Sequence, residues 1–115
     1  MADEASQPRQ VIIFADRTGK EPFTDWLWSL RDATARRRIL TRLRRVEQGN
    51  FGDYRGLSEG IYELRFTFGP GYRIYFGQDG NTLVVLLSGG DKSSQSQDVE
   101  RAKAYWKEYQ DNAAL

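Results

Sequence analysis

The chain contains no cysteine and no histidine among its 115 residues. Without cysteine it forms neither a disulfide framework nor a thiolate metal site. Without histidine it lacks the usual proton shuttle and the commonest transition-metal ligand, so this chain alone builds neither a Ser-His-Asp nor a Cys-His site. We therefore expect no metal ion and no other cofactor. Acid–base chemistry here has to use carboxylates, lysine, tyrosine or arginine.

Long apolar runs are also missing. No stretch approaches the roughly 20 residues that span a bilayer, and Met1 to Gln10 is polar, unlike a signal peptide. We therefore expect a cytoplasmic protein without a membrane partner. The length suits one domain. We predict a flexible arm over residues 1–9 and a single domain over residues 10–110.

What the chain does have is an uneven distribution of charge. The net charge is +1, but residues 31–55 hold eight arginines and three acidic residues, a local net charge of +5. Clustered arginine is typical of surfaces that bind a phosphate backbone. A solvated helix face and a surface for an acidic partner segment are the alternatives.

Helical spacing of apolar residues predicts two consecutive helices. The first begins at Pro22, and the second is capped by Asp32 and ends near Gly49. Their short connection predicts an antiparallel helical hairpin. A last helix follows the segment 88–96, which we interpret as a loop, and its predicted capping box is formed by Ser94 and Gln97.

Apolar residues at a spacing of two predict the strands. A short β-branched run over residues 10–15 precedes the helices, and three strands follow them over residues 61–68, 72–76 and 82–87. Tight turns join the last three strands, which predicts an antiparallel meander. The predicted fold class is therefore α+β, in the order β-α-α-β-β-β-α, with a small antiparallel sheet packed against the helical hairpin.

The hairpin is expected to cover one face of this sheet. The other face is then either open or covered by a partner. Strict alternation places Arg65, Arg73 and Tyr75 on that second face.

Three segments resemble a known family. They are Tyr62 to Phe66 (YELRF), Gly69 to Phe76 (GPGYRIYF) and Leu86 to Gln95 (LLSGGDKSSQ). In this order they resemble the RelE/ParE toxin superfamily, with the phage Gp49-like or HigB-like addiction module killer proteins as the nearest branch. The resemblance implies a RelE-like fold and the toxin of a type II toxin–antitoxin (plasmid stabilisation) module. It also implies a helix-turn-helix antitoxin as partner, and operator DNA bound only through that antitoxin.

The resemblance further implies growth inhibition, most often by cleavage of mRNA on the ribosome. Cleavage by the RNA 2′-hydroxyl needs a base, cationic donors for the phosphorane charge, and an acid for the leaving oxygen. We assign the donors to Arg65 and Arg73, a proton-donating or base-stacking role to Tyr75, and the base role to Lys92. The predicted RNA contacts are Arg37, Arg38, Arg42, Arg45 and Arg55.

Two other functions remain open at this point. The resemblance to ParE-like proteins allows a DNA gyrase inhibitor with no catalytic site. The missing histidine favours a protein that only binds its antitoxin. The prediction is therefore a metal-independent endoribonuclease with these two alternatives.

Overall fold

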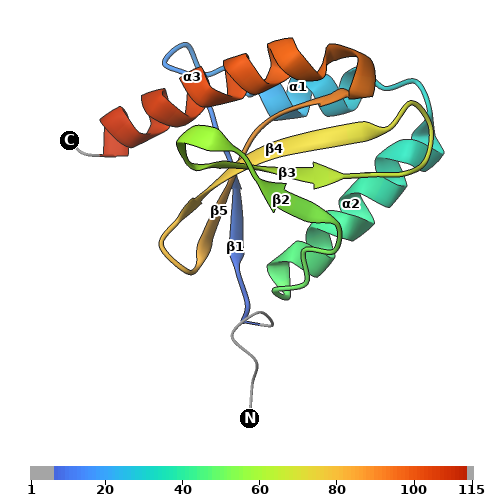
Figure 1. Cartoon of the computed structure of the whole chain (residues 1–115), viewed down its shortest axis with the longest axis horizontal. Coiled ribbons are helices and arrows are strands. Elements are labelled where there is room, and N and C mark those ends of the chain that lie inside the picture. Colours follow the sequence, from blue (N-terminus) through green and yellow to red (C-terminus); the bar gives the residue numbers. More distant parts are fainter. Residues whose placement is uncertain (1–6, 114–115) are drawn as a thin grey trace.

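A computed structural model describes residues 7–113 of the chain and contains one five-stranded sheet flanked by helices on both faces (Figure 1). The principal elements are β1 (Gln10–Ile13), α1 (Pro22–Ser29), α2 (Ala33–Glu47), β2 (Tyr54–Gly56), β3 (Ile61–Arg65), β4 (Tyr72–Asp79), β5 (Leu83–Asp91) and α3 (Gln95–Ala113). Short 3₁₀ turns precede β3 (Ser58–Gly60) and α3 (Lys92–Ser94). Within the described residues no helix has the length and apolar character to cross a membrane.

The sheet has the strand order β1-β5-β4-β3-β2. The predicted antiparallel meander of β3, β4 and β5 is confirmed. However, β1 runs parallel to β5, so the sheet is mixed and not purely antiparallel as predicted. The edge strand β2 was not predicted, because its three exposed residues show no apolar alternation and are held by pairing with β3 alone.

The first four residues of the predicted loop 88–96 belong to β5, and the others form the 3₁₀ turn and the start of α3. Ser88 pairs with Tyr75 and Gly90 with Arg73, so the strand continues to Asp91. The two glycines serve close packing on opposite faces. A Cβ at Gly89 would lie 2.2 Å from the Trp26 ring of α1, and one at Gly90 would lie 1.8 Å from the Asp98 carboxylate of α3. The prediction of a loop was wrong because glycine here admits neighbouring elements.

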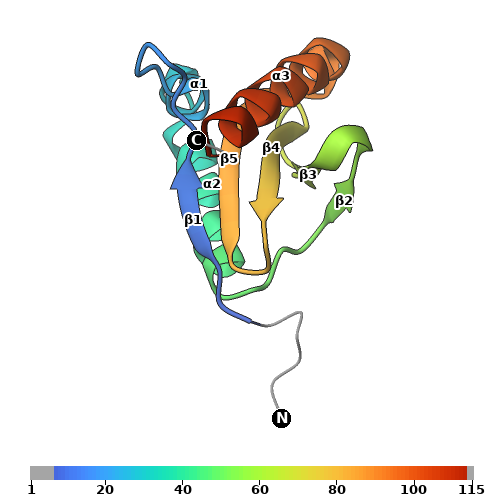
Figure 2. The same ribbon diagram turned by 90° about the vertical axis from the view of Figure 1, so that its left-hand side faces the viewer.

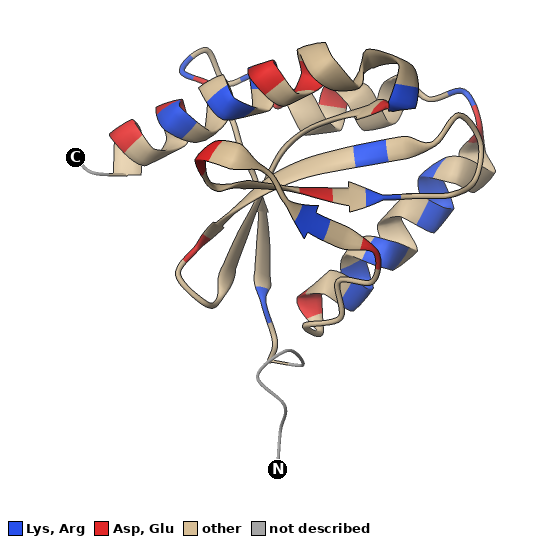
Figure 3. Ribbon diagram, in the orientation of Figure 1, with Lys and Arg blue, Asp and Glu red and all other residues tan. Residues whose placement is uncertain are grey.

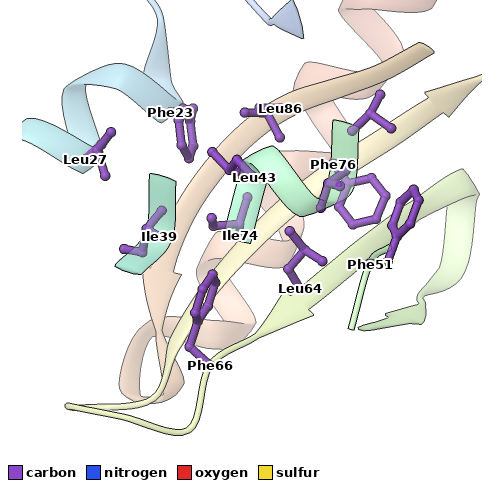
Figure 4. Close-up of a cluster of buried hydrophobic side chains, with 12 residues drawn as sticks. Phe23, Leu27, Ile39, Leu43, Phe51, Leu64, Phe66, Ile74, Phe76 and Leu86 are labelled. Atoms are coloured by element: carbon purple, nitrogen blue, oxygen red, sulfur yellow. The ribbon is translucent and has the colours of Figure 1, made fainter. Parts of the chain in front are cut away.

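Helices α1 and α2 cover one face of the sheet, as predicted. Their apolar stripes meet the inner side chains of β3, β4 and β5 in the larger core, part of which is shown in Figure 4. The predicted antiparallel helical hairpin is not formed: the two helices run in different directions from their short connection, and each packs mainly on the sheet (Figures 1 and 2). Asp32 accepts hydrogen bonds from the amides of Thr34 and Ala35, which confirms it as the N-cap of α2.

The second face of the sheet is not open. Helix α3 crosses it, and Ala102 and Trp106 pack on Tyr75, Val85 and Leu87 in a second core. This corrects the prediction that the face is bare or left for a partner. The apolar stripe of α3 finds its surface within the same chain.

Two predictions concern the ends of these elements. The capping box before α3 joins Asp91 and Ser94, not Ser94 and Gln97. Residues 1–6 of the predicted flexible arm lie outside the described residues. At the end of the arm, Arg9 donates its backbone N–H to the Glu47 carbonyl at 2.8 Å, and its side chain lies over the Phe51 ring.

Candidate functional site

The arginines of α2 line a groove on one flank of that helix. Because Ala35, Ile39, Leu43 and Val46 form the buried stripe, the charged residues between them face outward. The groove has a volume of about 490 Å³ and separates α2 from the end of β3 and the loop after it. Its lining residues are Thr34, Arg37, Arg38, Thr41, Arg42, Arg45, Asp53, Arg65, Phe66, Thr67 and Phe68. Figure 3 shows the basic bands along α2 and the basic end of β3.

Three of these arginines offer free charge to a ligand. Arg37, Arg38 and Arg45 are exposed, and among residues 7–113 none of them has a carboxylate within ion-pair distance. The guanidinium of Arg38 lies 4.9 Å from the centre of the Phe68 ring, which places a cation over an aromatic face in the groove. Three unpaired guanidinium groups suit a ligand with several phosphates.

Arg42 has a different role from its neighbours. Its guanidinium donates to the backbone carbonyls of Phe51, Asp53 and Arg65 and lies over the Phe66 ring. Burial lowers the pKa of this side chain from its usual value. Its donors therefore already hold the segment before β2 against the end of β3. The sequence predicts an RNA contact at Arg42, and the structure gives it a scaffolding position within the groove.

A row of cations crosses one end of the sheet next to this groove. Arg65 of β3 pairs in register with Arg73 of β4, and Arg73 pairs with Gly90 of β5. A Cβ at Gly71 would lie 3.5 Å from both the Arg73 guanidinium and the Cβ of Lys92, so these two side chains are neighbours. The fold thus brings the predicted residues Arg65, Arg73 and Lys92 together.

These cations differ in how freely they are presented. Lys92 is exposed. Arg65 forms an ion pair of 2.7 Å with Asp53, and its side chain is 34% exposed. Arg73 is only 13% exposed and donates to the carbonyls of Phe66, Gly71 and Tyr72. Lys92 and Arg65 are therefore the members of the row that a ligand reaches first.

Tyr75 lies one step deeper beneath α3 and is fully buried. Its hydroxyl has no hydrogen-bond partner among the described residues. Burial raises the pKa of this phenol, and the nearby Glu63 and Asp98 carboxylates raise it further. The predicted stacking of Tyr75 on an RNA base is wrong for this conformation, because α3 covers the ring. Of its two predicted roles, only that of a proton donor fits this position, where the phenol lies beside Arg73.

Glu63 belongs to this site, although the sequence analysis did not predict it. It pairs in register with Tyr75 and is fully buried. Its carboxylate lies 3.6 Å from the Arg73 guanidinium and 3.5 Å from that of Arg55, and it accepts a 2.7 Å hydrogen bond from Gln95 of α3. The only sequence signal for this role is a carboxylate at an inward-facing strand position between Ile61 and Arg65.

Arg55 lies on the other side of the sheet from the groove. It stands on β2 and shares the Glu63 carboxylate with Arg73. Its side chain is 51% exposed, beside the start of α3. The structure therefore separates Arg55 from the other predicted RNA contacts and joins it to the buried polar cluster.

These features define a small α+β domain with an arginine-lined groove beside a row of cations on the sheet. Over residues 25–109 the chain matches the family model described as phage derived protein Gp49-like (DUF891), and it belongs to the Gp49-like family. It is also 44% identical over 81 residues to an uncharacterized protein of Haemophilus influenzae, in a match that covers 70% of this chain and 82% of that protein. The Gp49-like family is associated with toxin–antitoxin modules, which points to an antitoxin as partner.

Proposed function

We propose that this chain is the toxin of a type II toxin–antitoxin module and that it acts on RNA as a metal-independent endoribonuclease. The observation that carries the proposal is the groove in which Arg37, Arg38 and Arg45 present free charge beside Phe68. The family association with toxin–antitoxin modules supports the toxin role. The resemblance to RelE/ParE and HigB-like toxins supports mRNA, free or on the ribosome, as the target.

The proposed path of the RNA follows from where the cations lie. The groove and the row meet at Arg65, which borders both. A strand held by Arg37, Arg38 and Arg45 therefore leads its next phosphate to Arg65 and Lys92. The Arg65 guanidinium at that position stabilises the charge that develops on the phosphorane.

The remaining roles go to the groups around that phosphate. We assign the base for the 2′-hydroxyl to Lys92, because it is the exposed amine of the row. Arg73 orients the site through its hydrogen bonds to the turn before β4. In this mechanism the Tyr75 phenol supplies a proton to the leaving oxygen, which requires α3 to move away from the sheet.

The first test is induction of the chain alone in bacteria, with growth and transcript 5′ ends followed over minutes. We expect growth arrest with new cut sites in translated mRNAs. The Arg38→Glu variant reverses a charge inside the groove and is expected to lose the arrest. The Arg44→Glu variant makes the same change on the same helix outside the groove and is expected to keep it.

Other outcomes separate the alternatives. Arrest with intact mRNA and damaged DNA contradicts the ribonuclease and moves the target to gyrase. Absence of arrest from a folded chain contradicts the toxin role and leaves antitoxin binding as the function. If Arg38→Glu and Arg44→Glu behave alike, the groove is not the RNA site.

Binding is measured separately from cleavage with a single-stranded RNA oligonucleotide and the Lys92→Ala variant. We expect this variant to bind RNA without cutting it. Adding Arg38→Ala should weaken binding and lower the slope of log K against log salt by about 1, because one phosphate contact is lost. An unchanged slope would place the phosphates elsewhere.

A further inference from the structure

The outer edge of β1 is free for another strand. In a parallel pair the backbone groups of alternate residues point to the partner, and here the amides of Gln10 and Phe14 donate to Thr82 and Leu86 of the β5 side. The amides of Val11 and Ile13 therefore point away from the sheet. Within residues 7–113, β5 is the only strand that pairs with β1.

This edge lacks the charge, proline and bulge that commonly block strand addition, although β1 is only four residues long. Exposed edges are commonly protected by lysine, proline, a bulge or a very short strand. The other edge, β2, has three residues, one of them Arg55. In contrast, β1 reads Gln-Val-Ile-Ile, with neither charge nor proline. Such an edge suits a strand supplied by a partner.

The surface beside this edge on the α2 side combines apolar and basic side chains. Val11 packs into the larger core, so Ile13, two residues later, points to the same face and is 41% exposed. Figure 2 shows α2 behind β1 and β5. Arg36, Leu40 and Arg44 follow at four-residue spacing on the stripe of α2 opposite the groove. Leu40 is 42% exposed, and Arg36 joins this stripe to Trp28, which is 68% exposed.

The other face of the edge also offers an apolar surface. A hollow of about 370 Å³ lies between the end of β1 and the end of α3. It is lined by Ile12, Ile13, Phe14, Ala15, Tyr109, Asn112 and Ala113. A strand added to β1 projects its side chains alternately to the two faces. One set then meets Ile13 and the exposed flank of α2, and the other meets Ile12 and Tyr109.

We infer that the outer edge of β1 is the docking site of an extended antitoxin segment that is apolar along its length and carries acidic residues. The apolar character follows from the surfaces on both faces of the edge. The acidic residues follow from Arg36 and Arg44, which flank Leu40 and would repel the same stripe of a second copy. This inference rests on the proposed toxin role, because that role supplies the antitoxin as the occupant.

Hydrogen exchange of the purified chain, alone and with the antitoxin encoded by the adjacent gene, tests the docking directly. In the free chain the amides of Val11 and Ile13 should exchange fast, and that of Ile12 slowly. In the complex all three should exchange slowly. If the Val11 and Ile13 amides stay fast in the complex, or if no complex forms, the inference is overturned.

A pair of variants tests the same point by affinity. Ile13→Glu places a carboxylate at the edge and should raise the Kd for the antitoxin about tenfold or more, because that charge is buried beside an acidic segment. Tyr54→Glu alters an aromatic residue of similar exposure, 44%, at the opposite edge and should leave the Kd unchanged. Leu40→Glu should act like Ile13→Glu, and melting curves confirm that each variant is folded.

Growth assays distinguish failure of this inference from failure of the toxin role. An Ile13→Glu chain that arrests growth and is no longer neutralised by the antitoxin supports both. An Ile13→Glu chain that is neutralised normally overturns the docking site and leaves the toxin role intact. If the free chain is a dimer that Ile13→Glu dissociates, the occupant is a second copy and the inference is overturned.

Discussion

Tyr75 and Glu63 are directly paired residues on neighbouring strands, and both are fully buried. One is a phenol without a hydrogen-bond partner among residues 7–113, and the other is a carboxylate shared by two arginines. A buried polar group without a partner costs about 1–3 kcal/mol, so such a residue is retained only where something else requires it. The proposed proton transfer is a requirement of that kind.

The Tyr75→Phe variant separates stability from chemistry. Removing an unpaired buried hydroxyl should leave the free energy of unfolding unchanged or raise it by about 1 kcal/mol. Toxicity should fall sharply if the phenol is the proton donor. Urea unfolding and the growth assay measure the two effects. A marked loss of stability would mean that the hydroxyl is bonded in the folded chain, and retained toxicity would rule out the proposed acid.

The Glu63→Gln variant tests the buried ion cluster. It leaves the mostly buried Arg73 without a counter-charge, so the free energy of unfolding should fall by about 3 kcal/mol. Asp53→Asn removes the carboxylate partner of Arg65 at an exposed position and should cost less than about 1 kcal/mol. Equal losses in the two variants, measured by urea unfolding, would contradict the description of Glu63 as a buried anchor.

The sequence predicted part of this arrangement. Alternation along β3 and β4 placed Arg65, Arg73 and Tyr75 on one face, and the structure agrees. The burial of Tyr75 was not predicted, because it depends on α3, which arrives from a distant part of the chain. The partner of Arg73 was also missed, since nothing in a local pattern distinguishes a buried glutamate from a solvated one.

Helix α3 is held on the sheet by close approach as much as by apolar area. A Cβ added to Gly77 of β4 would lie 2.4 Å from the Trp106 ring. In the same way, a Cβ on Gly90 would collide with the Asp98 carboxylate. Ser94 donates to Asp98 and Gln95 to Glu63, which fixes the first turn of the helix. The helix therefore covers Tyr75 through contacts at both its start and its middle.

The Gly77→Ala variant tests this docking. The added methyl group should force Trp106 outward and lower the free energy of unfolding by about 1–3 kcal/mol. Gly56→Ala, whose Cβ would lie 3.5 Å from the Tyr62 ring, is the control with an ordinary contact. Near-UV circular dichroism reports the Trp106 environment, and urea unfolding reports stability. A Gly77→Ala chain with an unchanged spectrum would contradict the packing described here.

The elements themselves were predicted unevenly, for physical reasons. The helices of residues 22–30 and 32–49 follow strong apolar periodicity with recognisable caps, and the structure confirms both. The strand β2 carries no such pattern, and its pairing with β3 depends on tertiary contacts. The glycines at the end of β5 are typical of a loop in composition, but in the structure they leave room for the side chains of Trp26 and Asp98.

The two cores lie on opposite faces of one sheet, so the same strands contribute side chains to both. Helices α1 and α2 pack on one face and α3 on the other, while β5 contributes Val84 and Leu86 to the first core and Val85 and Leu87 to the second. Loss of either helical layer therefore exposes one side of the same strand. The length and composition predict a single domain. Local sequence patterns do not predict that helices pack on both faces of the same sheet, because that packing depends on tertiary contacts.

We expect the chain to unfold in one cooperative transition. Far-UV circular dichroism reports the helices and the sheet, whereas the tryptophan fluorescence of a Trp28→Phe chain reports Trp26 and Trp106 on opposite faces. The two urea curves should coincide in midpoint and slope. A separate early change in fluorescence would mean that α3 opens as an independent unit, which would also give the proposed catalytic site a direct route to Tyr75.

The pairing of β1 with β5 has a consequence for biosynthesis. Ile13 leaves the ribosome early, but its partner Leu86 is made more than two thirds of the way along the chain. Until β5 is made, β1 has no strand to pair with, and both cores lack the side chains that β5 contributes. Contacts between residues so far apart in the sequence also form slowly. A nascent chain interrupted before β5 therefore stays unfolded and accessible to proteases. Under the proposed toxin role, translation therefore has to pass β5 before a folded toxin exists.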